Sequence, residues 1–217
     1  LADKTDNPTQ PCALLLGGTK ISDKIALLHN LMEKVETILI GGAMAFTFLK
    51  AKGTNVGASL IDDKNLHIVE EILSLAEKSK TNIMLPVDVV AANEMSPDAP
   101  WRVANIDQLE DDEFGYDIGP ETTMNFEMLL SDKKTILWNG PMGVCEIPAF
   151  STGTQAIASV IRDRTEDGAI SIIGGGDTAS ALQNIGITDG FTHISTGGGA
   201  SLQLMSGKQL PALEVLH

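Results

Sequence analysis

The sequence predicts an α/β protein, a Rossmann-like three-layer domain in which a mainly parallel sheet lies between two layers of helices. Three observations lead to this prediction. Short apolar runs of strand length alternate with segments whose apolar residues recur at helical spacing. Glycine is abundant, with 21 residues, and several glycine clusters directly follow apolar runs. Buried strands that are connected through helices form parallel sheets covered on both faces.

The apolar runs predict the strands in chain order. CALLLG continues into a glycine pair, and ETILIG does the same after the first helical segment. Most of the runs are largely apolar, which is typical of strands buried on both faces. The expected strands cover residues 12–17, 36–41, 82–92, 134–140, 169–175 and 192–196.

Helical spacing marks the segments between these strands. The clearest case is 64–80, where Leu66, Val69, Leu73 and Ala76 share one face and lysines gather near the C-terminal end. The expected helices are 23–34, 43–53, 64–80, 120–132, 150–164, 177–186 and 198–207.

The 217 residues are enough for one large domain. No repeat, low-complexity segment or internal linker divides them, and the acidic stretch 105–115 is expected to be an irregular surface excursion. We therefore expect one domain over residues 1–217. We also expect a monomer.

The net charge and the cysteines limit which partners and which cellular compartment we expect for this protein. The formal net charge of −14 argues against DNA, RNA or an anionic membrane as a partner. No apolar stretch is long enough to span a membrane, and the first ten residues lack a secretory signal pattern. Cys12 and Cys145 each sit beside an apolar run, so we expect free buried thiols and a cytoplasmic protein.

Five strand ends carry glycine or polar clusters that open the next helix. The clusters are GGTKISDK (17–24), GGAMAF (41–46), WNGPMGV (138–144), GGGDTAS (174–180) and STGGGAS (195–201). In a parallel sheet these ends share one edge, and backbone N–H groups at helix starts bind anions. In so acidic a chain, a phosphate site also needs lysines and a metal ion.

Charged side chains in two clusters suggest how a polyphosphate is held. Lys20 and Lys24 are four residues apart, so on a helix both could reach one polyphosphate; the alternative is two solvated surface lysines. Asp177 follows three glycines, as either a helix N-cap or a Mg²⁺ ligand, and the two roles are compatible. The glycine run 197–199 indicates bare backbone against an anion more than a plain tight turn.

Other site classes find little support. The sequence has neither the G-x-x-x-x-G-K-[ST] loop nor a complete G-x-G-x-x-G fingerprint. The four histidines show no zinc-ligand spacing, and there is no G-x-S-x-G nucleophile elbow.

Seven motifs, in order along nearly the whole chain, together resemble the C-terminal domain of phosphoglycerate kinase. They are LLGGTKISDKI, LIGGAMAFTFLKAKG, LPVDVVAA, YDIGPET, TILWNGPMGVCE, SIIGGGDTAS and HISTGGGASLQLMSGKQLP. The resemblance implies the nucleotide-binding half of a two-domain phosphotransferase with a carboxyl group as acceptor. That glycolytic enzyme reversibly transfers a phosphoryl group from 1,3-bisphosphoglycerate to ADP, giving 3-phosphoglycerate and ATP, with Mg²⁺ as cofactor.

The resemblance also implies individual roles. Lys20 would contact the phosphoryl group in transit, Lys24 the nucleotide's phosphates, and Asp177 the Mg²⁺ ion. At the start of the last helix, backbone N–H groups would donate to the phosphoryl group; they belong to Gly197, Gly198 and Gly199. Glu146 would bind the ribose, and the remaining nucleotide-binding residues would be Gly17, Gly18, Gly41, Leu60, Gly115, Tyr116, Asn139, Pro141, Val144, Gly175, Gly176 and Thr178.

Three departures from the family pattern matter. Thr19 stands where Ala or Ser is usual, which is a mild change. Tyr116 stands where Leu is usual, so packing against adenine is expected to differ slightly. The family's N-terminal domain, with its basic patch for phosphoglycerate and its catalytic arginine, is not among these 217 residues. We expect this chain alone to bind Mg-ADP or Mg-ATP without being active. The alternatives are a non-catalytic nucleotide-binding module and, on fold class only, a dinucleotide-binding oxidoreductase domain.

Overall fold

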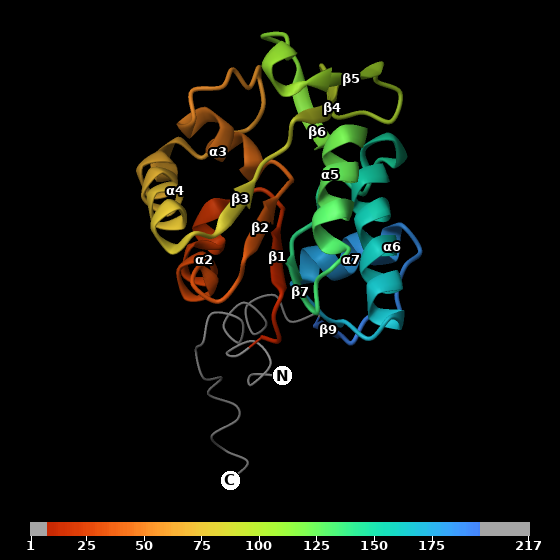
Figure 1. Ribbon diagram of the computed structural model, residues 1–217. Helices are drawn as coiled ribbons and strands as arrows, with labels where there is room; N and C mark the ends of the chain where they lie inside the picture. Colours follow the sequence, from red (N-terminus) through yellow and green to blue (C-terminus); the bar gives the residue numbers. More distant parts are fainter. Residues whose placement is uncertain (1–7, 196–217) are drawn as a thin grey trace, which may run out of the picture.

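A six-stranded parallel sheet forms the centre of the protein (Figure 1), in a computed structural model that describes residues 8–195. The strand order is β3-β2-β1-β7-β8-β9, and every neighbouring pair is parallel. The strands are β1 (Cys12–Leu16), β2 (Thr37–Ile40), β3 (Asn82–Met84), β7 (Thr135–Asn139), β8 (Ile170–Gly174) and β9 (His193–Ser195).

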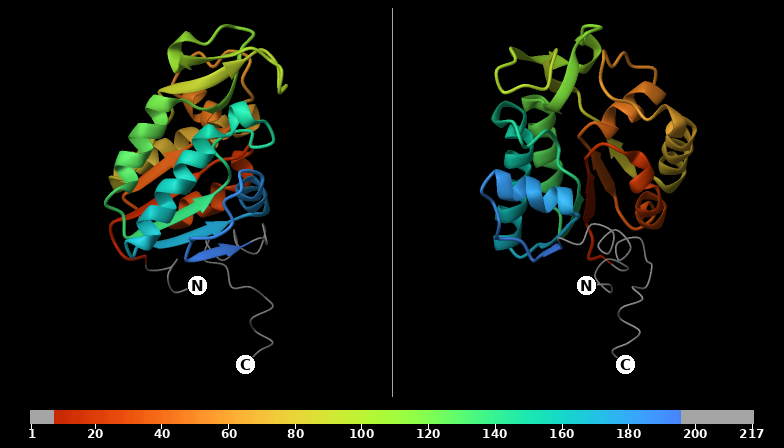
Figure 2. Two further views of the ribbon diagram at one scale, coloured as in Figure 1. Left: turned by 90° about the vertical axis from the view of Figure 1, so that its right-hand side faces the viewer. Right: turned by 180° about the vertical axis from the view of Figure 1, so that it is seen from behind.

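Helices cover both faces of this sheet, as two further views show (Figure 2). One face carries α2 (Ile25–Leu31), α3 (Met44–Ala51) and α4 (Leu66–Ser79). The other carries α5 (Pro120–Leu130), α6 (Thr152–Glu166) and α7 (Gly176–Asn184).

Strand β1 shows why the sheet is covered twice. Successive side chains of a strand point to opposite faces. Leu14 and Leu16 enter the core beneath α2, α3 and α4, whereas Ala13 and Leu15 enter the core beneath α5, α6 and α7. The predicted three-layer α/β fold class is thus confirmed.

A second, antiparallel sheet of order β5-β4-β6 stands beyond the carboxyl edge of the large sheet, at the top of Figure 1. Its strands are β4 (Asp88–Ala92), β5 (Trp101–Asn105) and β6 (Phe114–Ile118). The prediction of one strand over 82–92 was wrong, because β3 and β4 belong to different sheets. Pro86, which cannot donate a ladder hydrogen bond, lies in the break between them. The expected excursion 105–115 connects two strands that the sequence analysis did not predict.

Two buried aspartates fasten the small sheet to the helices. The Asp88 carboxylate accepts hydrogen bonds from the N–H groups of Thr122 (2.7 Å) and Glu121 (3.0 Å) at the start of α5. The Asp117 carboxyl group accepts one from the N–H of Gly153 (2.8 Å) at the start of α6. Helix N-termini have N–H groups without intrahelical partners, so each carboxyl group stabilises a helix end and anchors the sheet there.

The first helix begins later than predicted. Ile21–Asp23 form a 3-10 helix, and α2 starts only at Ile25. Lys20 precedes this turn in an extended conformation, and Lys24 follows it. A 3-10 helix has three residues per turn, so positions four apart do not share a face. The expectation that both lysines project from one helix face was therefore wrong.

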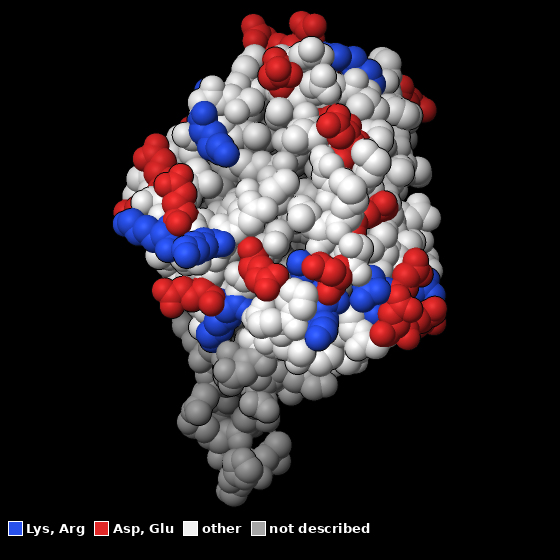
Figure 3. Space-filling model, in the orientation of Figure 1, with Lys and Arg blue, Asp and Glu red and all other residues white. Residues whose placement is uncertain are grey.

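The prediction for the cysteines is confirmed, and the surface carries charged side chains of both signs. On the face drawn in Figure 3, acidic and basic side chains are interspersed around a hollowed central area. Cys12 and Cys145 are free and buried. Within residues 8–195, every helix is too short or too polar to cross a membrane.

Candidate functional site

The candidate site lies where the strand order changes direction, between β1 and β7. The chain runs from β1 to β2 and β3 on one side, and from β7 to β8 and β9 on the other. Open α/β sheets bind ligands outside the carboxyl ends of their strands at such a switch point. The loops after β1, β2 and β7 meet there.

Backbone hydrogen bonds lock these three loops together. The Gly18 N–H donates to the Pro141 carbonyl (2.9 Å), and the Gly42 N–H to the Met142 carbonyl (2.9 Å). The Gly18 carbonyl in turn accepts from the Met44 N–H (3.0 Å). The expectation that N–H groups of the first two clusters face an anion is wrong for Gly18 and Gly42, because those groups bind neighbouring loops.

Gly17 is required by this close approach. A Cβ at this position would lie 2.0 Å from the Pro141 carbonyl oxygen and 2.7 Å from that of Gly140. The backbone at Gly17 or the facing backbone at Gly140 and Pro141 must then move. We therefore expect Gly17→Ala to lower the free energy of unfolding by about 3 kcal/mol, measured by urea denaturation.

Gly53→Ala is the control for this substitution. Its added Cβ meets nothing within 4 Å, so only the positive φ of Gly53 opposes it, at roughly 1–2 kcal/mol. Equal stability losses in the two variants would contradict the role given to loop contact at Gly17.

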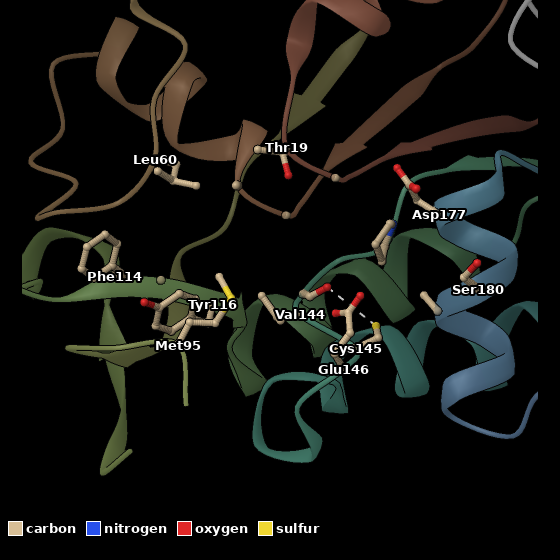
Figure 4. Close-up of a pocket in the computed structure, with 17 residues that line it drawn as sticks. Thr19, Leu60, Met95, Phe114, Tyr116, Val144, Cys145, Glu146, Asp177 and Ser180 are labelled. Carbon is tan, nitrogen blue, oxygen red and sulfur yellow. Dashed lines mark hydrogen bonds between the residues drawn. The ribbon is translucent and has the colours of Figure 1, made fainter. Parts of the chain in front are cut away.

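These loops, the small sheet and α7 enclose a pocket of about 530 Å³ (Figure 4). This volume lies in the range of roughly 300–1,000 Å³ that is usual for small-molecule sites. Figure 4 shows Asp177 of α7 at one end and Glu146 in the middle. Apolar side chains gather at the other end, namely Leu60, Met95, Phe114 and Tyr116.

Aromatic rings stack at the apolar end. The ring centroids of Phe114 and Tyr116 are 5.7 Å apart, with 14° between the ring planes. Tyr116 also stacks on Phe150, with centroids 4.8 Å apart. Between them, a Cβ at Gly115 would lie 2.1 Å from the Phe46 ring, so glycine lets β6 lie against α3. The result is an apolar wall suited to stacking on a planar ring.

Polar side chains next to Asp177 form a second feature. Lys24 is half-buried and donates a hydrogen bond to Oδ1 of the buried Asn139. The Nδ2 atom of Asn139 has no hydrogen-bond partner among residues 8–195. Burial lowers the pKa of the Lys24 ammonium, while the carboxylates of Asp23 and Asp177 act to raise it. An unpartnered buried donor is costly, so a ligand acceptor beside Asn139 would be stabilising.

The N-cap interpretation of Asp177 is wrong. Gly175 is the N-cap residue of α7, and Asp177 is the second helical residue, with an exposed side chain. A carboxylate there is stabilised by the helix dipole and stays accessible to a cation. Within residues 8–195, no three His, Cys, Asp or Glu side chains come together as a metal site. One carboxylate fits Mg²⁺, which typically also takes phosphate and water ligands.

The structure brings eight of the sixteen predicted site residues that it describes into the pocket lining. These are Gly18, Leu60, Gly115, Tyr116, Pro141, Val144, Glu146 and Asp177. The other eight described residues do not line it: Gly17, Lys20, Lys24, Gly41, Asn139, Gly175, Gly176 and Thr178. Gly197, Gly198 and Gly199 lie outside the described residues.

Two of these eight residues have clear local positions. Lys20 is exposed. The Thr178 hydroxyl accepts from the Gly140 N–H (2.7 Å) and donates to the Gly174 carbonyl (2.8 Å), so it ties the loop after β7 to the end of β8.

Several lining residues were missed from the sequence, among them Met95, Phe114 and Cys145. The spacing of Phe114 and Tyr116 was a usable signal, because residues two apart on a strand share a face. Met95 follows β4 in a loop and carried no signal. Burial raises the pKa of the Cys145 thiol to about 11, so this side chain is no thiolate nucleophile at neutral pH.

Comparison with known families decides the assignment. The family model described as phosphoglycerate kinase matches residues 1–208. The chain belongs to the phosphoglycerate kinase family. The oxidoreductase alternative rested on fold class only, and this membership gives it no support.

Known phosphoglycerate kinases are similar to this chain over nearly its whole length. That of Chloroherpeton thalassium is 49% identical over 216 residues, covering 100% of this chain and 54% of the relative. One from Bifidobacterium longum is 48% identical over 222 residues, with 100% and 55% covered. The solved structure of phosphoglycerate kinase from Coxiella burnetii has a TM-score of 0.93 and 42% identity, covering 99% of this chain and 55% of that one. The chain thus spans about half the length of these phosphoglycerate kinases.

Proposed function

We propose that this chain is the C-terminal, nucleotide-binding half of a phosphoglycerate kinase and holds Mg-ADP or Mg-ATP for phosphoryl transfer. The pocket at the switch point carries this proposal. Its apolar wall lies at one end, Glu146 in the middle and Asp177 at the other end. A nucleotide has the same order, with an apolar base, a ribose and charged phosphates.

The apolar end supports a role in base binding. Tyr116, Leu60 and Val144 offer apolar surface on which a planar base can pack. Glu146 is exposed, so its carboxylate can accept hydrogen bonds from ribose hydroxyls.

The opposite end supports a role in phosphate binding. Bound Mg²⁺ would neutralise part of the phosphate charge, and Asp177 is the side chain that would hold it. Lys24 adds a positive charge, and Asn139 adds its unpartnered Nδ2 donor. In this proposal Lys20 and the N–H groups of residues 197–199 contact the phosphoryl group in transit.

The other half of the enzyme would supply the phosphoglycerate. Phosphoryl transfer needs in-line alignment of donor and acceptor together with charge neutralisation, and little covalent work by the protein. With one substrate on each half, closure of the two halves would align them and exclude water.

Substitution of Asp177 tests the nucleotide proposal. Mg²⁺ is expected to strengthen ADP binding to the unmodified chain, measured by titration calorimetry. In Asp177→Ala the Mg²⁺ dependence should disappear, a loss of roughly 10–100-fold in affinity, because a charged contact is removed.

Glu121→Ala is a matched control. Glu121 is also an exposed second residue of a helix, α5, but does not line the pocket. This variant should keep the Mg²⁺ dependence. Unchanged Mg²⁺ dependence in Asp177→Ala would contradict the metal role, and tighter binding of NAD than of ADP would contradict the proposed ligand class.

A further inference from the structure

We infer that Asp117 is a positioning residue of the nucleotide pocket, whose buried carboxyl group holds the Tyr116 wall and the loop 143–146 in a fixed relation. The inference rests on the proposed function, since it takes this pocket as the nucleotide site. Asp117 itself does not line the pocket.

Three structural elements meet at the Asp117 carboxyl group. Oδ1 accepts a hydrogen bond from the N–H of Ile118 in β6 (2.9 Å), and Oδ2 accepts one from the N–H of Gly153 in α6 (2.8 Å). The loop after β7 packs directly on it, because a Cβ at Gly143 would lie 2.3 Å from Oδ1. The side chain is buried, and Asp117 is only 4% exposed.

The segments on both sides of this carboxyl group build the pocket. Tyr116, the preceding residue, carries the aromatic wall, and its carbonyl accepts a hydrogen bond from the Val144 N–H (3.0 Å). Gly143, Val144, Cys145 and Glu146 line the adjoining wall. The carboxyl group therefore lies behind the seam between the base wall and the proposed ribose site, so a change there moves both.

The site requires a carboxyl group of this length. Both oxygens accept from backbone N–H groups, and a carboxyl group has acceptor lone pairs on each oxygen whether ionised or protonated. An asparagine amide offers one acceptor oxygen, so its NH₂ group must face one of the two N–H donors in either orientation. Glutamate is too long, because Gly143 and Gly153 already pack against the carboxyl group.

Asp88 provides a matched comparison within the same small sheet. It is 3% exposed, and its two carboxylate oxygens accept from the N–H groups of Thr122 and Glu121. Asparagine there also loses one acceptor. Among the described residues, however, α5 contributes nothing to the pocket lining. Asp88→Asn thus reproduces the loss of a helix cap without disturbing the pocket wall.

The test compares the unmodified chain with Asp117→Asn and Asp88→Asn. Tyr116 is the only tyrosine of the sequence, so selectively labelled tyrosine gives one set of ring resonances that reports on the pocket wall. Asp117→Asn should shift these resonances and weaken Mg-ADP binding about tenfold, the equivalent of one lost hydrogen bond. Asp88→Asn should lower the unfolding midpoint comparably, while leaving the ring resonances and the ADP dissociation constant unchanged.

The outcomes separate the inference from the proposed function. If Asp117→Asn keeps the ADP affinity and the Tyr116 resonances of the unmodified chain, the inference is wrong. Asp117 then only stabilises the start of α6. Absence of ADP binding by the unmodified chain would overturn the proposed function, and the ring resonances would then decide the role of Asp117 alone.

A measurement on the unmodified chain covers the case in which Asp117→Asn does not fold. ADP should shift the amide resonance of Gly153, which is coupled to the pocket through Asp117, and leave that of Thr122 in place. An unmoved Gly153 resonance on ADP saturation would overturn the inference.

Discussion

The 217-residue chain on its own is expected to turn over 1,3-bisphosphoglycerate at a rate orders of magnitude below that of a full-length phosphoglycerate kinase. Catalysis of phosphoryl transfer consists mainly of positioning and charge neutralisation. Effective molarities for well-oriented partners reach about 10⁵–10⁸ M. A chain that binds only the nucleotide loses this advantage, because the second substrate meets it by collision in a site open to water.

The described residues offer no unpaired arginine for a phosphoglycerate site. The sequence has three arginines, and each of them is paired with a carboxylate in the structure. The pairs are Arg102–Glu113 (2.7 Å), Arg164–Asp167 (2.8 Å) and Arg162–Asp189 (3.6 Å). The net charge of −14 also repels a free anionic substrate.

A coupled assay of ATP formation measures this expectation. Adding the N-terminal half of a full-length relative should restore part of the turnover, and Asp177→Ala in this chain should remove most of the restored activity. Turnover by the chain alone near that of an intact relative would contradict the half-enzyme proposal.

Rising pH is expected to remove the stability contributed by Asp117. Burial raises the pKa of this carboxyl group to about 8, while hydrogen bonds from the Gly153 and Ile118 N–H groups act to lower it. In the unfolded chain the same group has a pKa of about 3.9. At pH values between the two pKa values, the folded chain therefore binds a proton that the unfolded chain does not. The free energy of unfolding should therefore fall by up to about 1.4 kcal/mol per pH unit between about pH 4 and 8.

Urea denaturation of the unmodified chain and Asp117→Asn isolates this contribution from the other carboxylates. The stability advantage of the unmodified chain should shrink by up to about 4 kcal/mol from pH 5 to pH 8 and then level off. An advantage that grows with pH would mean that the folded chain holds Asp117 ionised below its ordinary pKa.

The large sheet was predictable from the sequence and the small sheet was not. Strands buried on both faces appear as apolar runs, as β1 and β7 do. Strand β5 is exposed at every position except Ala104, so it has no such run. Strand β6 contains Gly115 and Asp117, residue types that are depleted in strands. Gly115 is accommodated by the ring of Phe46, and Asp117 by the start of α6.

The candidate site shows the same division. Its motifs could be placed along the chain because glycine clusters directly after strands are local features. The sequence did not show which backbone N–H groups remain for a ligand. Those of Gly18 and Gly42 do not, because they donate hydrogen bonds to carbonyl groups of a neighbouring loop. Nor did it show that the 3-10 turn at Ile21–Asp23 separates Lys20 from Lys24.

By itself the sequence determined the layered fold and the order of the proposed phosphate-binding segments, because apolar periodicity and strand-end glycines are properties of short windows. Only the tertiary structure decided that Lys24 turns inward to Asn139, 115 residues away, and that Asp117 joins β6 to α6 behind the pocket. The physical reason is that these roles depend on hydrogen bonds and close packing between distant segments. No local pattern records such contacts, and they exist only once the two halves of the sheet meet at β1 and β7.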